Sequence, residues 1–327
     1  MQTLTAESRP SNARTSALDL DDKAPWRDLD RNSFSFRHHL ANHPLFELPR
    51  LAALSHKVFG RVDFDRYFLP EELKLGRPEL ERRLHDAVLG IGTNNRWLAL
   101  HYINELDPDY KALFQELLAD IEILADAPIR ERMTWGGMTV FMNSPGLAVP
   151  YHFDHETNFL LQIRGGKEVR VYPNDRSVLT EEEIEDFYRH NPVAARYRSE
   201  LADVGTSYWI TPGIGVHHPP LAPHRINNGS EVSISLSVYY TMPDTEYRAH
   251  VYQANFFLRK LGLHPRPPGV SPALDAFKNR AIQAFSMSHP RTHDEALFSG
   301  IARLAMPVRI AKKFKDRLRL GAQIGQS

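Results

Sequence analysis

The sequence predicts a mainly β fold with helical additions, built on a jelly-roll core. Residues 132–245 contain short segments of strand composition, separated by turns rich in Pro and Gly. The last segment, 232–240, alternates aliphatic residues with serines at a period of two. On both sides of this block, apolar residues recur at three- and four-residue steps, which is typical of amphipathic helices. Short antiparallel strands joined by such turns are typical of a β sandwich or a closed jelly roll.

Composition divides the chain into four parts. The first residues are polar and show no period, so we expect a mobile tail there. The basic, amphipathic end of the chain, 302–327, could pack on its own domain, form a homodimer, or dock on another partner or an anionic surface. The expected parts are a tail over 1–25, a mixed helical region over 26–131, the core over 132–245 and a helical region over 246–327.

Several elements outside the strands can be placed from local signals. A Pro followed by acidic residues favours a helix start, and a capping box favours another. We expect helices over 48–58 and 79–89, helices that begin at Pro70 and at Asp107, and further helix after 246. We also expect a strand at 96–103 and a helical insertion over 178–203 that opens with the capping box Thr180–Glu183.

Overall charge and residue usage exclude several classes of protein. Lys+Arg and Asp+Glu are equal at 40 each, so there is no electrostatic footprint for nucleic acid. The chain has no cysteine, which excludes disulfides, thiolate zinc sites and Cys nucleophiles. No apolar run approaches eighteen residues and the N-terminus lacks an apolar signal region, so we expect a cytoplasmic protein without a membrane span.

The final strand of the core predicts the wall of a polar cavity. Val232, Ile234, Leu236 and Val238 share one face, which should pack against protein, and Ser233, Ser235 and Ser237 share the other. A serine-lined face suits a small polar cavity, and a solvent-exposed sheet face is the alternative.

A candidate metal site lies in the stretch 151–167. Read as one extended strand, it puts His152, Asp154 and Glu156 on one face. A histidine and a carboxylate two residues apart supply two ligands of a 2-His-1-carboxylate site for Fe(II). Because about one His-x-Asp is expected by chance in a chain of this composition, the motif alone is weak. The third ligand would be His217, His218 or His224, and we favour His224 because it follows a Pro-rich turn at the start of the last strand.

The segments "PYHFDHETNFLLQIRGGKEVRVYP" and "PPLAPHRINNGSEVSISLSVYY" carry a resemblance to a family. Together they resemble the JmjC and cupin-like Fe(II)- and 2-oxoglutarate-dependent oxygenases, and most of all the bacterial cupin-like proteins and the asparaginyl-hydroxylase branch. The Asn-Phe-Leu-x-Gln-Ile-x-Gly-x-Lys run at fixed offsets behind His-x-Asp is the specific part. The resemblance covers 132–245 and implies a double-stranded β-helix.

The resemblance also implies roles for individual residues. The iron ligands would be His152, Asp154 and His224, and Lys167 would bind the far carboxylate of 2-oxoglutarate. Asn158 falls on a family position in the same site, and with Ser235 and Ser237 it could hydrogen-bond that carboxylate or orient the ligands. The chain departs from the family at Val149, where a Thr or Tyr is frequent, and at Gly213-Ile214, where Gly-Asp is usual.

The sequence therefore predicts an oxygenase that hydroxylates a C–H bond and requires Fe(II) and 2-oxoglutarate. A non-redox metal-binding cupin, acting as a hydrolase, an isomerase or a small-molecule binding protein, is the main alternative. A degenerate, structural member of the family is the second. The substrate, whether a small molecule, a peptide or a protein, does not follow from the sequence.

Overall fold

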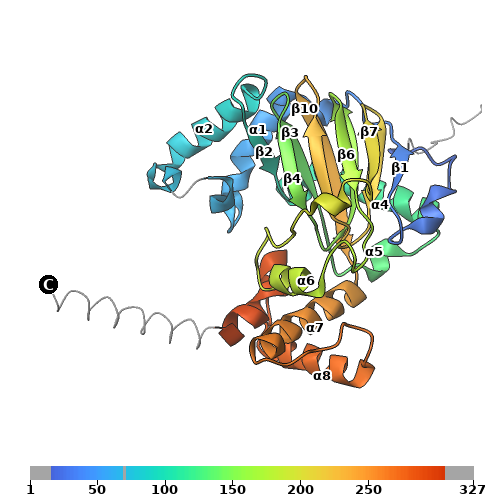
Figure 1. Cartoon of the computed structure of the whole chain (residues 1–327). Coiled ribbons are helices and arrows are strands. Elements are labelled where there is room, and N and C mark those ends of the chain that lie inside the picture. Colours follow the sequence, from blue (N-terminus) through green and yellow to red (C-terminus); the bar gives the residue numbers. More distant parts are fainter. Residues whose placement is uncertain (1–15, 69–70, 306–327) are drawn as a thin grey trace, which may run out of the picture.

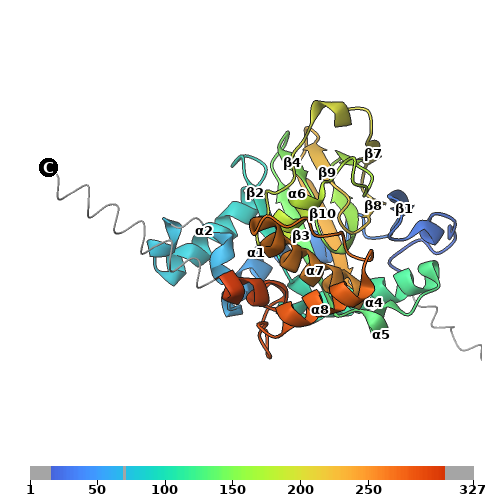
Figure 2. The same cartoon turned by 60° about the horizontal axis from the view of Figure 1, so that its bottom comes forward.

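The computed structural model describes residues 16–68 and 71–305 (Figures 1 and 2). Its centre consists of two antiparallel sheets, in the strand orders β1-β8-β5-β10-β3-β2 and β4-β9-β6-β7. From β3 to β10 the chain alternates between these sheets, except that β6 and β7 are neighbours in the smaller one. This connectivity is that of a double-stranded β-helix, so the predicted fold class is confirmed. The strands are β1 (Phe34–Arg37), β2 (Trp97–Leu100), β3 (Trp135–Asn143), β4 (Ala148–His152), β5 (Thr157–Arg164), β6 (Lys167–Val171), β7 (Thr206–Ile210), β8 (Ile214–His218), β9 (His224–Asn228) and β10 (Ser233–Thr241).

Helices surround this β core on several sides. In Figure 1, α1 and α2 lie on one side of the sheets, and α6, α7 and α8 lie together below them; Figure 2 brings α7 and α8 forward. The α-helices of the described part are α1 (Leu48–Ser55), α2 (Arg77–Leu89), α3 (Ile103–Leu106), α4 (Pro108–Ala125), α5 (Ile129–Arg132), α6 (Glu181–Tyr188), α7 (Pro243–Lys260) and α8 (Pro272–Gln283), and residues 293–305 are also helical. Short 3₁₀ helices occupy Pro25–Asp28, Pro44–Phe46, His56–Gly60, Phe64–Tyr67, Glu72–Lys74 and Ser199–Leu201.

Local signals placed most helix starts correctly. Asp107 caps α4, because its carboxylate accepts a hydrogen bond from the backbone N–H of Asp109. The capping box of Thr180 and Glu183 is present in full at the start of α6. The helical insertion is shorter than predicted, since α6 ends at Tyr188 and most of the following residues up to 203 form turns and irregular structure.

Part of the predicted tail over 1–25 packs on the core instead of being mobile. Ala17 and Leu18 are buried, and their backbone N–H groups donate to the carboxylate of Asp120 in α4. Leu18 also forms an isolated β-bridge with His38. Burial of apolar side chains and satisfied backbone groups attach this segment to the core. Residues 1–15, Pro70 with its predicted helix start, and 306–327, which hold most of the predicted basic helix, lie outside the described residues.

The two faces of β10 explain why this strand is buried along its whole length. Its apolar face packs in the main hydrophobic cluster, together with side chains of β3, β5, α1, α2 and α4. The serine face looks into the barrel, where a second cluster is formed by Leu160, Val169, Val171, Ile210, Val216, Ala222 and Ile226. The prediction that one face packs against protein and the other lines an interior is confirmed.

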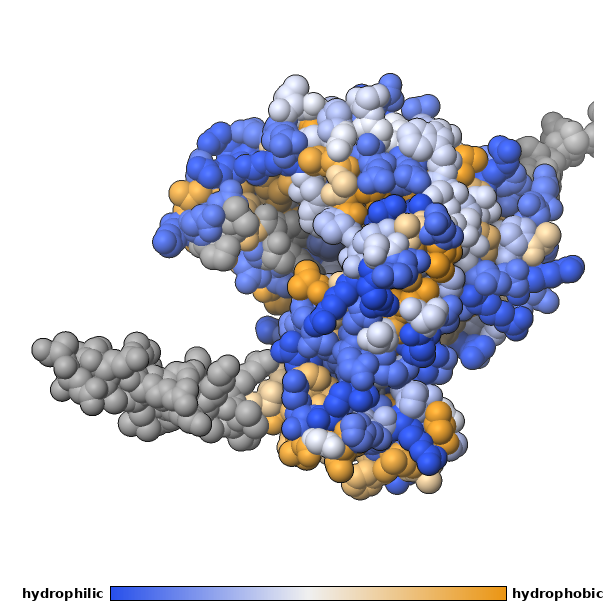
Figure 3. All heavy atoms as spheres, in the orientation of Figure 1, coloured by the Kyte–Doolittle hydropathy of each residue, from blue (hydrophilic) through white to orange (hydrophobic). Residues whose placement is uncertain are grey.

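The C-terminal helices carry apolar side chains on their outer surface. Figure 3 shows hydrophobic residues gathered on the lower part of the molecule, over the region of α7 and α8. The exposed members include Leu261, Leu263, Leu274 and Phe277. The predicted homodimer and the predicted domain boundaries remain predictions. Within the described residues, none of the helices combines the length and the apolar character needed to cross a bilayer.

Candidate metal centre

The stretch 151–167 is not one continuous strand, as the sequence alone suggested. β4 ends at His152, the chain bends over 153–156, and β5 begins at Thr157 in the other sheet. The bend is needed because a jelly roll crosses from one sheet to the other at this point. Asp154 is held within the bend, where its carbonyl accepts a hydrogen bond from the backbone N–H of Leu221 at 2.8 Å.

Strand pairing brings the second histidine to the first. β4 pairs with β9, and the register places His152 directly opposite His224, with ring centroids 4.2 Å apart. His224 does not lie at the start of β10, as predicted, but begins its own strand in the smaller sheet. Leu221, in the turn that leads to β9, has a φ of 62°. A left-handed non-glycine residue is strained, and such strain is often found beside functional sites.

The three predicted ligands converge. His152, Asp154 and His224 each offer one ligand atom, and these atoms all lie within 4.8 Å of one another. The Nε2 atom of His224 is 3.7 Å from the Oδ2 atom of Asp154. The prediction that Glu156 shares a face with His152 and Asp154 was wrong. Glu156 groups with His155 and His293 instead.

The hydrogen bonds of the two imidazoles leave the correct nitrogen available for a metal. The Nδ1 atom of His152 lies 2.8 Å from the carbonyl oxygen of Pro150, and that of His224 lies 3.1 Å from the carbonyl oxygen of Ala222. If each Nδ1–H donates to its carbonyl, each Nε2 carries a lone pair, which is the usual arrangement of metal-bound histidines. The three donors thus fit a divalent cation.

The protonation states of the buried ligands suit a bound cation. Burial lowers the pKa of His224 well below its usual value, with a further lowering by His152, so this imidazole is neutral at neutral pH as a ligand must be. Burial also raises the pKa of Asp154, which His152 opposes. A bound cation would stabilise the ionised carboxylate in this low-dielectric environment.

Lys167 is a buried cation inside the barrel. It shares the inward face of β6 with Val169 and Val171, and only 1% of its surface is exposed. Burial lowers the pKa of its ammonium group to about 7. Among residues 16–68 and 71–305, nothing forms a hydrogen bond or an ion pair with it. Since burying an unpaired charge is costly, the site favours an anionic ligand beside this group.

The registers of β6 and β9 place Lys167 deeper in the barrel than the metal ligands. Lys167 pairs with Asn228, and Val171 pairs with His224. Four residues of strand separate these two positions, which corresponds to about 13 Å along β6. The side chain of Lys167 and an oxoacid bound at the ligands could together bridge this distance.

The predicted polar wall has its own internal hydrogen bonds. Ser237 donates to the side-chain oxygen of Asn158 at 3.0 Å, which leaves the amide nitrogen of Asn158 without a partner among the described residues. Ser235 donates to Gln162 at 2.6 Å, and Gln162 in turn donates to Ser233. Asn158 is therefore available to a ligand, whereas Ser235 is engaged in holding the sheet residues together.

The rival ligands His217 and His218 point to opposite faces of β8. His217 faces outward: its Nδ1 lies 3.0 Å from the carbonyl oxygen of Asn158, and its Nε2 accepts from the backbone N–H of Asp30 at 3.2 Å. His218 lies opposite Asn158 in the register and its ring centroid is 4.4 Å from that of His224. It is buried, and within the part of the chain that the structure describes neither of its ring nitrogens has a hydrogen-bond partner.

His218 lies at the site although the sequence favoured His224 over it as the third ligand. The adjacent pair His217-His218 was the available signal, since neighbouring residues of a strand face opposite sides and one of them had to face the barrel. Val149 also packs against the interior cluster, so this position offers no hydroxyl to a ligand.

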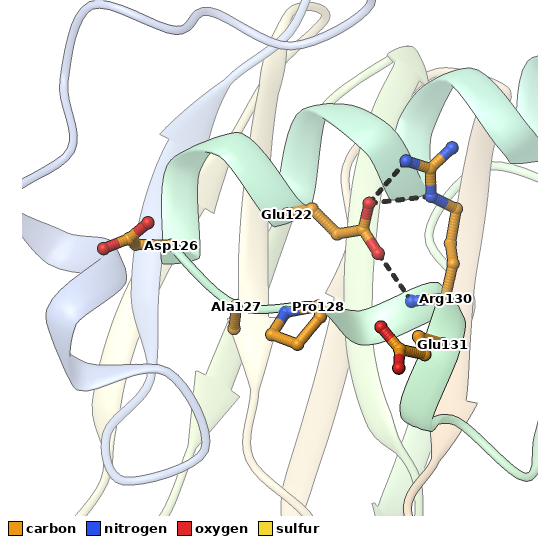
Figure 4. A pocket seen from close by; sticks show the side chains of 6 residues that line it. All are labelled: Glu122, Asp126, Ala127, Pro128, Arg130 and Glu131. Carbon is orange, nitrogen blue, oxygen red and sulfur yellow. Dashed lines mark hydrogen bonds and ion pairs between the residues drawn. The ribbon is translucent and has the colours of Figure 1, made fainter.

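One surface hollow, of about 650 Å³, lies away from the barrel beside the end of α4 and α5. There Glu122 accepts hydrogen bonds from the backbone and side chain of Arg130 (Figure 4). Because these charged groups satisfy one another, the hollow offers no chemistry comparable to that of the barrel.

Comparison with known proteins gives distant structural neighbours. No family model and no curated protein sequence matches the chain. Among solved structures, the E. coli protein ycfD is 19% identical with a TM-score of 0.34, over 60% of this chain and 49% of that one. A structure of the same ribosomal oxygenase with cobalt and 2-oxoglutarate is 17% identical with a TM-score of 0.33, over 61% and 43%. A cupin superfamily protein from Desulfitobacterium hafniense is 10% identical with a TM-score of 0.24, over 45% and 79%.

This chain spans about half of the length of the E. coli protein. At such identities and TM-scores, activity has to be inferred from the site itself.

Proposed function

We propose that this chain is an Fe(II)- and 2-oxoglutarate-dependent oxygenase that hydroxylates a C–H bond of its substrate. One observation carries the proposal: two imidazoles and a carboxylate converge at one end of a barrel whose interior also holds an ammonium group that pairs with none of the described residues. A 2-His-1-carboxylate set leaves coordination positions open for a chelating oxoacid and O2. In the overall reaction, 2-oxoglutarate and O2 yield succinate and CO2, and the second oxygen atom enters the substrate as a hydroxyl group.

The residues of the chain would bind and orient the reactants. His152, Asp154 and His224 would hold Fe(II), which with 2-oxoglutarate and O2 supplies the oxidising chemistry when bound. Lys167 would pair with the far carboxylate of 2-oxoglutarate, and a compact ammonium suits such a point contact. The amide nitrogen of Asn158, whose orientation Ser237 fixes, would donate a hydrogen bond in the same cavity.

The apolar residues of the barrel would keep water away from the reaction. Leu160, Val169, Val171 and Ile226 belong to the cluster inside the barrel, between the two sheets. Exclusion of water strengthens the pairing of Lys167 with an anion and protects reactive species from side reactions.

A non-redox metal-binding cupin is the second candidate, and His218 is the observation that favours it. Its imidazole lies beside His224 and has no hydrogen-bond partner among the described residues. It is outside the group of donors that lie within 4.8 Å of one another, and a rotation of its ring towards that group would offer the metal a third histidine. A site with three histidines and one carboxylate has fewer open positions for a chelating oxoacid and O2. Zn²⁺, Ni²⁺ or Mn²⁺ could then support hydrolysis or isomerisation.

Succinate formation separates the two candidates. Metal-free protein is loaded with Fe(II) under anaerobic conditions, given 2-oxoglutarate and exposed to O2, and succinate is measured. We expect iron-dependent succinate that Lys167→Ala abolishes. The matched control is Arg170→Ala, on the same strand but on its other face, and it should retain the activity. Metal binding without any turnover of 2-oxoglutarate would favour the non-redox cupin.

A further inference from the structure

A second group of metal-binding side chains lies where the barrel meets the C-terminal region. His155 and Glu156 are in the bend between β4 and β5, and His293 begins the helical residues 293–305. Each of the three offers one ligand atom, and these atoms all lie within 4.8 Å of one another. None of these three residues belongs to the candidate iron site. His155 directly follows Asp154 in the sequence.

Contacts hold the side chains of this group in place. The Oε1 atom of Glu156 is 3.3 Å from the Nε2 atom of His155 and 3.9 Å from the Nδ1 atom of His293. The two imidazoles stack with ring centroids 5.0 Å apart and an interplanar angle of 20°. The indole of Trp135 also stacks on His293, with a centroid distance of 5.4 Å. Both rings therefore point a nitrogen atom towards one carboxylate oxygen.

An ion pair accounts for only part of this arrangement. The carboxylate of Glu156 lies within ion-pair distance of the Nε2 atom of His155, so these two residues can form a pair. His293 does not take part in this pair, because the 3.9 Å between its Nδ1 atom and the Oε1 atom of Glu156 is too long for a hydrogen bond. His155 and His293 are only 4% and 3% exposed. One cation between Nε2 of His155, Nδ1 of His293 and the carboxylate of Glu156 would engage the three groups that face one another. The opposite ring nitrogens, Nδ1 of His155 and Nε2 of His293, have no hydrogen-bond partner among the described residues.

We propose that His155, Glu156 and His293 form a second metal site. Two imidazole nitrogens and one carboxylate oxygen favour Zn²⁺ or a similar transition metal ion over Mg²⁺ or Ca²⁺. The side chain of Glu156 is 20% exposed, which leaves room for a water molecule as a fourth ligand. This site does not depend on the proposed oxygenase function, because none of its residues belongs to the candidate iron site.

The site gives the C-terminal region a structural link to the barrel. A metal ion bound there would tie the start of the helix at 293 to the bend that directly follows Asp154. Structural zinc sites contribute their binding free energy to folding, so the metal would stabilise this junction. The position of the bend, and with it that of Asp154, would then depend on the C-terminal region.

Metal stoichiometry tests the proposal on the full chain. The protein is stripped with a chelator and titrated with Zn²⁺, and bound zinc is measured by elemental analysis after removal of the excess. We expect two equivalents for the wild type, one for His293→Ala and one for Asp154→Ala. Removal of one of its three ligands should weaken zinc binding at the second site by about 100-fold or more. The control His289→Ala removes an exposed histidine of the same segment and should leave two equivalents.

A second variant separates loss of metal from loss of packing. Glu156→Gln keeps the shape of the side chain and removes the charged donor, so it should bind one equivalent and lose part of the zinc-dependent rise in Tm. The proposal would fail if His293→Ala and Glu156→Gln both still bound two equivalents of zinc and their Tm were lowered equally with and without zinc. The three side chains would then be a merely structural cluster. A single equivalent in the wild type that Asp154→Ala removes would overturn the proposal and leave the candidate iron site intact.

Discussion

Replacement of Lys167 by methionine should stabilise the ligand-free protein. The ammonium group is buried without a partner among the described residues, and burial lowers its pKa from 10.5 to about 7. Because the folded-state pKa is below the unfolded value, the unfolded chain binds more protons between these pH values, and stability rises as the pH increases. The destabilisation is complete below pH 7 and disappears above pH 10.5. Methionine has a similar shape and no charge, so it removes this cost.

The magnitude follows from the size of the shift. At 1.36 kcal/mol per pKa unit, the buried ammonium costs about 4 kcal/mol at pH 7 and about 1 kcal/mol at pH 9.5. We therefore expect the free energy of unfolding of the wild type, relative to Lys167→Met, to rise by about 3 kcal/mol over this interval. The difference between the two proteins removes the contribution of other groups that titrate in the same range.

Urea denaturation of both proteins at several pH values between 7 and 9.5 measures this difference. An anion that pairs with the ammonium raises its folded-state pKa again. Saturating 2-oxoglutarate with a divalent metal, without O2, should therefore flatten the pH dependence of the wild type and leave Lys167→Met unchanged. The reasoning is refuted if Lys167→Met is the less stable protein at pH 7 and the difference does not vary with pH.

Four further substitutions test the site and the fold. His224→Ala should abolish metal binding at the candidate iron site, whereas His217→Ala should retain it and lose only stability, which calorimetric titration and a thermal melt can distinguish. Leu236→Ala removes a fully buried side chain from the outer face of β10 and should lower the free energy of unfolding by about 2–5 kcal/mol, with no change in iron binding. Gly165→Ala should fold poorly or lose several degrees of Tm. Gly165 has a φ of 71°, and an added Cβ would lie 2.4 Å from the carbonyl oxygen of Val232. A melting curve like that of the wild type would contradict this.

Local patterns in the sequence were sufficient for much of the fold. The alternation of 232–240 predicted both faces of β10, because side chains of a strand alternate whatever the strand packs against. The capping box at Thr180 and the cap at Asp107 predicted helix starts, since caps depend on the backbone of a single turn. Helix length after the cap was less certain, and the insertion after Thr180 is helical only to Tyr188.

The arrangement of the site needed the tertiary structure. His-x-Asp supplied two neighbouring ligands, but the choice between His217, His218 and His224 depended on the register of β4 with β9. No periodicity could show that the chain bends after His152, because the bend arises from the crossing between two sheets. Glu156 was assigned to the wrong group for the same reason.

Pairs that are distant in sequence lay beyond any local pattern. Lys167 could be assigned a role from its offset, but only the folded barrel shows that its ammonium is buried and that none of the described residues pairs with it. His293 had no signal at all, since it meets His155 and Glu156 through the packing of the C-terminal region against the barrel. The sequence alone determined which residues could bind a metal and which faces were apolar, because these properties are local. Only the tertiary structure decided which of them meet, because that depends on strand register and on the packing of distant segments.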